Sequence, residues 1–229
     1  MMIRMNTTAS TTTPTVTSNS AFADLPADDP RSVFGRAAAL AGTTLVAVTD
    51  AQRGLPTPCP DFDVRGLVGH LVTVLRRVTA LGEGADPMDM PPSTPVDDDA
   101  WAATWAAWVA RVEAVWPDER LDVMMTLPWT TMPGRAMLAQ YTNELSVHTW
   151  DVAVATGQRP TWDDTVLEVA FAAIQRGMPD VGRGERFAEF AATLPAGVPF
   201  SPPFGEAVAA PADAPLIDRL VAWNGRDPR

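Results

Sequence analysis

Glu144 and His148 are a pair of residues whose types and spacing could hold a metal ion. They lie four residues apart within 136–156, a segment that contains no proline or glycine. One helical turn would place both side chains on the same helix face, about 6 Å apart along the axis, close enough to bind one divalent ion. A carboxylate at the edge of an apolar face must be neutralised, paired or bound to metal, because an unpaired buried charge is costly. The alternative is a Glu–His hydrogen bond or ion pair at the edge of a helical bundle.

Both histidines of the chain are predicted to face the interior of such a bundle. Around His148, apolar residues recur at intervals of three and four, as in a helix with one buried face: Met137, Tyr141, Leu145 and Val152. His70 shares a face with a second such series: Val64, Leu67, Leu71, Val74 and Val78. A lone histidine on an apolar face is more often a core residue with one hydrogen bond than a ligand. Two of them, with a carboxylate beside one, favour a site of two histidines and one glutamate.

Four segments of the sequence resemble an actinobacterial family of metal-binding proteins. In chain order they read TPCPDFDVRGLVGHLV, TLPWTTMPG, ELSVHTWDVAVATGQ and APLIDRLVAWNGRDP. This family is related to DinB-like proteins and to the N-terminal domain of mycothiol-dependent maleylpyruvate isomerase. The resemblance implies an all-α fold, a DinB-like antiparallel four-helix bundle, with His70, Glu144 and His148 as the metal ligands. DinB relatives often have histidine where this chain has Glu144, whereas the isomerase branch has glutamate, so the match favours the isomerase.

Three protein ligands would leave a coordination position open, as in catalytic metal sites. Two neutral imidazoles and one carboxylate leave a divalent ion with a net charge of about +1, which can activate a bound thiol or water. Nitrogen and oxygen ligands suit zinc, nickel and iron; we expect zinc, with nickel or iron as alternatives. The resemblance adds mycothiol as a thiol cofactor.

Three further residues near these ligands are candidates for a role. Asp151, three residues after His148, is the candidate catalytic residue, either as a general base or as the hydrogen-bond partner of a ligand imidazole. The alternative is a solvent-facing charge on the helix flank. Tyr141 could hydrogen-bond Glu144 or pack in the core, and Arg77 could meet an anionic substrate or simply extend into water.

Composition restricts the partners. Asp plus Glu number 28 against 17 Lys plus Arg, a net charge of -11, which argues against nucleic acid or an anionic membrane. The sequence has no apolar run of the length that a membrane span needs. Cys59 is the single cysteine, which fits a reducing cytoplasm; we expect it to pack as a small apolar residue rather than bind metal. The expected partner is a small-molecule substrate or thiol cofactor, and the expected assembly a monomer or homodimer.

The chain is predicted to consist of three parts. Residues 1–30, rich in Thr, Ser and Ala, are predicted to be a disordered tail, 31–157 the metal-binding bundle, and 158–229 a C-terminal extension that packs on it. The extension should contain additional helices and could include short strands. With only about 70 residues after the fourth helix, it is smaller than the isomerase's C-terminal domain.

Within the bundle, the expected first helix runs from Arg31 to about Gln52. The second begins at an N-cap, Asp61 or Asp63, and ends near Gly82 or Gly84. Asp97 to Asp99 should cap the third, whose stripe of Trp101, Trp105 and Trp108 could be core or the wall of a substrate pocket. Residues 121–134 could form one or two short strands or an extended crossover. The fourth helix should begin after Gly134 and end at Gly157.

In the extension, a helix should start after Asp163 or Asp164 and stop at Pro179. No element is expected over 180–200. The stretch FGEAVAAP could be a short strand, and APLIDRLVAWNG a closing helix ended by Gly225.

Two classes of function fit these observations. One is a metal-dependent enzyme that uses a low-molecular-weight thiol, mycothiol by resemblance, to transfer to or isomerise a small electrophile. The other is a metal-binding or ligand-binding bundle without turnover, such as a stress-response or sensor protein. An open coordination position would favour the enzyme, and a fourth protein ligand the second class.

Overall fold

The computed structural model describes residues 20–194, 202 and 204–229. Most of the predicted N-terminal tail therefore lies outside the described residues. Its last part packs on the folded chain: Ala21–Asp24 form a short 3-10 helix, and Phe22 is buried in the main core.

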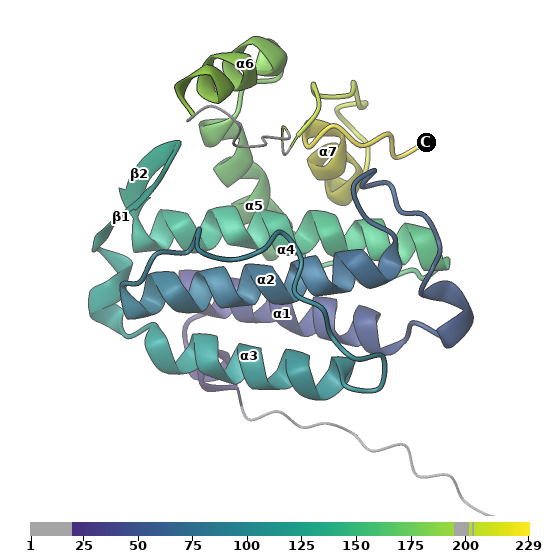
Figure 1. Ribbon diagram of the computed structural model, residues 1–229. Coiled ribbons are helices and arrows are strands. Elements are labelled where there is room, and N and C mark those ends of the chain that lie inside the picture. The colour runs from purple at the N-terminus through teal and green to yellow at the C-terminus, as the bar shows by residue number, and fades with distance from the viewer. Residues whose placement is uncertain (1–19, 195–201, 203) are drawn as a thin grey trace, which may run out of the picture.

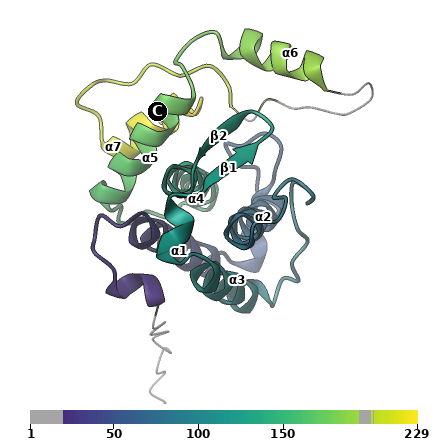
Figure 2. The ribbon, with the colours of Figure 1, turned by 90° about the vertical axis from the view of Figure 1, so that its left-hand side faces the viewer.

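Four long helices form the bundle that the sequence predicts, so the all-α prediction is confirmed. They are α1 (Pro30–Val46), α2 (Val64–Glu83), α3 (Trp101–Val115) and α4 (Gly134–Thr156). Figure 1 shows them side by side, and Figure 2 shows the same four nearly end-on, grouped around one interior. Their inward apolar residues make one continuous core. In a bundle of this kind, side chains in the middle of facing helices are held in place from both sides.

The ends of α2 and α4, which carry the predicted ligands, follow the expected local signals. The Asp63 side chain accepts a hydrogen bond from the Gly66 N–H at the start of α2, so Asp63 is the cap that the sequence left undecided. α2 ends at Gly84 and α4 at Gly157, both in the left-handed conformation that favours glycine.

The boundaries of α1 and α3 correct two predictions. α1 ends at Val46, and a separate 3-10 helix, Asp50–Gln52, covers the rest of the predicted span. α3 starts after Ala100 with no side-chain cap. Of the expected capping residues Asp97 to Asp99, Asp98 instead pairs with Arg65 and Arg53, because two guanidinium groups compete for its carboxylate.

The tryptophans of α3 are mainly core residues. Trp101 and Trp105 are buried, and the Trp105 indole N–H donates to the Ala38 carbonyl of α1. Trp108 is partly buried against the same core. The pocket-wall alternative for this stripe is therefore not needed.

A β-hairpin joins α3 to α4. β1 (Met124–Leu127) and β2 (Thr130–Pro133) are antiparallel, with Leu127 opposite Thr130 next to the turn. This confirms the strand alternative for 121–134. The hairpin lies at the end of the bundle where α2 stops and α4 starts (Figure 1).

In its described residues, the C-terminal extension adds three helices, α5 (Asp164–Gly177), α6 (Arg183–Thr193) and α7 (Leu216–Trp223). α5 and α7 pack on the outer face of α4 through a second apolar cluster that includes Val147 and Trp150. Asp163 caps α5, and Gly225, just after the α7 C-cap Asn224, has the positive φ that ends the helix.

Two predictions for this extension are wrong. α6 lies where no element was expected; its apolar period is short, because Phe187 is its one buried large apolar residue. The stretch 204–211 contains no strand, since its N–H groups bond instead to loop and helix-end carbonyls: Ala207 to Asp180, and Val208 to Ala222. Among the described helices, none is long and apolar enough to cross a membrane.

Candidate metal centre

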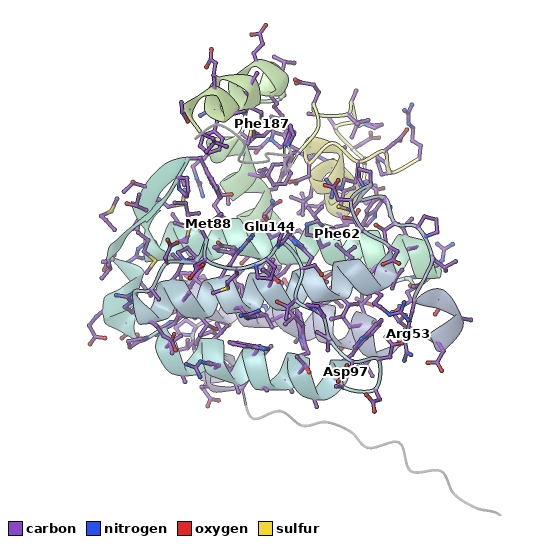
Figure 3. All side chains as sticks on the ribbon, viewed as in Figure 1. Arg53, Phe62, Met88, Asp97, Glu144 and Phe187 are labelled. Atoms are coloured by element: carbon purple, nitrogen blue, oxygen red, sulfur yellow. The ribbon has the colours of Figure 1, made fainter. Side chains whose placement is uncertain are left out.

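The fold brings His70, Glu144 and His148 together in the middle of the bundle. Glu144 Oε2 lies 3.5 Å from the Nε2 atoms of both His70 and His148. One ligand atom from each residue can be chosen so that all three lie within 4.8 Å of one another. Figure 3 labels Glu144 midway along α4, above α2. The predicted convergence is therefore present, while the role of the three residues as metal ligands stays a prediction.

The Nδ1 atoms of both imidazoles are occupied by other partners. His70 Nδ1 lies 2.7 Å from the Pro92 carbonyl oxygen, which can only accept, so Nδ1 carries a hydrogen and Nε2 is the ring nitrogen turned towards Glu144. His148 Nδ1 lies 2.9 Å from Asp151 Oδ2. Both Nε2 atoms consequently face the Glu144 carboxylate, which is the arrangement that a metal site with ordered imidazoles requires.

The Pro92 carbonyl is positioned by close packing of the loop after α2. This loop runs beside α2 in Figure 1, and the Thr94 N–H donates to the Gly69 carbonyl. Gly69 has no side chain at the contact, and an added Cβ would lie in steric conflict with Ser93 and Thr94. The sequence showed this segment only as a proline-rich loop, so the partner of His70 was missed.

Asp151 is a buried bridge between His148 and Arg226. Its side chain is 0 % exposed, and it accepts hydrogen bonds from Arg226 Nη2 at 3.0 Å and Arg226 Nε at 3.3 Å. The solvent-facing alternative is therefore wrong, and the geometry favours a partner that orients the ligand imidazole over a general base. Arg226 was not singled out from the sequence, although a buried carboxylate on α4 requires a cation from somewhere.

The charges of this cluster are coupled. Burial raises the pKa of Asp151, but its hydrogen bond with His148 and the charge of Arg226 outweigh burial and hold the pKa below its ordinary value. Burial also opposes the charged forms of Glu144 and His148. Their hydrogen bonds nevertheless lower the pKa of Glu144 well below normal and, with Asp151, raise that of His148. The two carboxylates therefore favour the charged form of the His148 ring that lies between them.

Cys59 lies close to this cluster without belonging to it. The Cys59 sulfur, one ring nitrogen of His148 and one carboxylate oxygen of Asp151 also lie within 4.8 Å of one another. Burial raises the pKa of the Cys59 thiol, and Asp151 is already paired with Arg226, so a protonated thiol packed in the core is the better description. The prediction of a packing role agrees with its place among the buried core residues.

Aromatic rings border the candidate ligands. The Phe62 ring stacks on His70 with centroids 5.1 Å apart, and the rings of His70 and His148 meet edge to face at 4.8 Å. Figure 3 shows Phe62 on one side of Glu144 and Met88 on the other. Of the two alternatives for Tyr141, the structure shows core packing; no hydrogen bond joins it to Glu144 in the described part of the chain.

The part of the chain that carries the candidate ligands also matches a known protein family. A sequence family described as the mycothiol maleylpyruvate isomerase N-terminal domain matches residues 34–153, more than half of the chain. The chain belongs to this family. Two uncharacterised proteins of Mycobacterium tuberculosis, from strains CDC 1551 / Oshkosh and ATCC 25618 / H37Rv, are similar to this chain. Each is 27% identical over 201 residues, covering 88% of this chain and 100% of the relative.

Two solved structures have a similar fold. The chain resembles the crystal structures of the mycothiol-dependent maleylpyruvate isomerase and of a histidine-to-alanine mutant of it, each with a TM-score of 0.55 and 17% identity. Each match covers 67% of this chain and 71% of the solved one. The segment matched to the family contains all three candidate ligands, while Arg226 lies beyond it.

Proposed function

We propose that this member of the mycothiol maleylpyruvate isomerase N-terminal domain family binds one divalent metal ion, preferably zinc, through His70, Glu144 and His148. We further propose that it uses this centre to activate a low-molecular-weight thiol, mycothiol, which it transfers to a small electrophile or uses to isomerise it. The observation that carries the proposal is the convergence of three ligand atoms from two helices, within 4.8 Å of one another.

The donor set fits a divalent ion. Two imidazole Nε2 atoms and a carboxylate oxygen are ligands that zinc accepts, and the hydrogen bonds of both Nδ1 atoms leave the Nε2 atoms available. When bound, the ion would supply Lewis acidity, which lowers the pKa of a thiol or water beside it.

The surrounding residues would order this centre. Pro92 holds the His70 ring, the Asp151–Arg226 pair holds the His148 ring, and Phe62 shields one face of His70. Among the described residues, no fourth His, Cys, Asp or Glu joins the group of three. A three-residue centre of this kind is typical of catalytic sites rather than closed structural ones. The thiol part of the proposal rests on membership of the family and on the mycothiol dependence of the related isomerase.

Metal analysis of the purified protein tests the proposal. We expect about one metal ion per chain in the wild type, and at least a tenfold lower content in His148→Ala and Glu144→Ala. Glu168→Ala, which removes an exposed carboxylate from α5, is the matched control and should retain the metal. Equal, substoichiometric metal in all four proteins would overturn the metal centre.

A conjugation assay with mycothiol and maleylpyruvate-like or epoxide electrophiles then tests the chemistry. Turnover that depends on the metal and is lost in Glu144→Ala supports the enzyme. Stoichiometric metal without turnover of any electrophile would instead favour the non-catalytic binding or sensor bundle.

A further inference from the structure

Arg77 and Tyr141 lie on one side of the candidate metal centre. Arg77 is seven residues beyond His70, two turns along the same face of α2, or about 10 Å along the axis. Tyr141 is one turn before Glu144 on α4. Because α2 and α4 run in opposite directions (Figure 1), both residues lie on the side of the centre that faces the β1–β2 hairpin.

Arg77 has no protein partner in the described part of the chain. Its Nε atom is buried and makes no hydrogen bond, and the described residues offer the guanidinium no ion pair and no aromatic face. The adjacent Arg76 differs: its Nη1 donates to the Thr94 hydroxyl at 2.7 Å, and its guanidinium lies 5.7 Å from the Trp108 ring centre. A buried donor without an acceptor is unfavourable, so Arg77 is suited to a ligand that supplies one.

Tyr141 adds a second donor near Arg77. The residue is 7 % exposed, and its hydroxyl makes no hydrogen bond with the described residues. Burial and the nearby Glu144 carboxylate raise the pKa of Tyr141, while the positive charge of Arg77 opposes them. A phenol keeps its proton near neutral pH, so Tyr141 can donate a hydrogen bond to an acceptor.

We propose that Arg77 and Tyr141 form a carboxylate-binding subsite beside the metal centre, and that the protein's ligand is a small molecule bearing a carboxylate. The Nε and Nη donors of an arginine form a planar fork that matches the two oxygens of a carboxylate, and Tyr141 can donate a third hydrogen bond. This inference rests on the proposed function, because the subsite would select molecules whose other end reaches the metal.

The test compares charged and neutral thiols of equal size on the cobalt-loaded protein. The probes are 2-mercaptoacetate, 3-mercaptopropionate and 4-mercaptobutyrate, each paired with its amide, and the thiolate-to-cobalt absorption band reports binding. The wild type should bind at least one acid about tenfold more tightly than its amide, the value of a charge-assisted hydrogen-bonded contact. Arg77→Gln should reduce this preference to about twofold or less, without changing cobalt stoichiometry or affinity for the amide.

Arg76→Gln is the matched control, because it removes the same charge from the adjacent position of α2. It should keep the wild-type preference, which separates a local subsite from the protein's overall negative field. Tyr141→Phe should lower the preference about threefold. Equal affinity for acid and amide at every chain length, or a preference that survives in Arg77→Gln, would overturn the subsite. Failure of the wild type to bind cobalt would overturn the metal centre instead, so the two proposals fail separately.

Discussion

Replacing Asp151 by asparagine should destabilise the fold strongly while preserving the shape of the side chain. Asp151 Oδ2 accepts from both His148 and Arg226, and Oδ1 accepts from Arg226. An asparagine has one oxygen and one amide nitrogen, so either orientation places an N–H group against another donor. Arg226, itself buried, would also lose its counter-charge. Breaking one side of a buried ion pair costs about 3–5 kcal/mol, and we expect a loss of about that size in the free energy of unfolding.

The same substitution should weaken metal binding, because the His148 ring would no longer be held with Nε2 towards Glu144. Loss of such a supporting contact typically reduces metal affinity about 10–100-fold. Urea denaturation of the metal-free protein measures the first effect, and zinc titration against a competing chelator measures the second. Asp227→Asn is the control: it removes an exposed aspartate paired only with the exposed Arg229, and should change neither quantity measurably. If Asp151→Asn behaves like this control in the urea experiment, the buried ion pair is not what stabilises this region; if only zinc affinity is unchanged, Asp151 does not position the ligand.

Two further perturbations address the ligand histidines. In the metal-free protein the pKa of His148 is raised. Protonation of His148 therefore stabilises the metal-free fold, fully so below the ordinary histidine pKa of about 6.5. This stabilisation is lost as the pH rises through the raised pKa. Zinc binds the neutral ring, so zinc affinity should increase with pH across that range, by up to about tenfold per pH unit. Calorimetric titrations in buffers of different ionisation enthalpy should detect the proton that is released. A zinc affinity that does not change with pH would contradict this. Gly69→Ala should displace the loop at Ser93 and so release the Pro92 carbonyl that holds His70. We expect a lower zinc affinity and a loss of about 1–3 kcal/mol in the free energy of unfolding. Gly54→Ala, at a position with open space around it, should change neither quantity in the same denaturation and zinc titrations.

The bundle and the three candidate ligands could be predicted from the sequence because both depend on short-range periodicity. Residues three and four apart share a helix face whatever surrounds the helix, and with only two histidines in the chain the choice of ligands was small. The partners of these ligands could not be predicted in the same way. Pro92 lies in a loop without a period, and Arg226 is separated from Asp151 by 75 positions, a pairing that only the packing of α7 on α4 determines.

The errors in the fold have the same origin. Asp97 to Asp99 carry the composition of a helix cap, but the position of Arg53 and Arg65, set by tertiary structure, decides where the Asp98 carboxylate binds. α6 has only two large apolar residues, Phe187 and Phe190, which is too short a pattern to indicate a buried helix face.

Through its ion pair with Asp151, Arg226 near the C-terminus supports the candidate metal centre in the middle of the bundle. A protein shortened after α4 would retain all three candidate ligands but lose Arg226, so Asp151 would keep only His148 as a charged partner. The bundle should therefore not be transplanted by itself into another scaffold. A chimera that exchanges the C-terminal segment between family members should work only when the incoming segment returns an arginine to this point. Changes at Asp151 and at the C-terminal arginine should therefore be made together, even though the three candidate ligands all lie in the bundle.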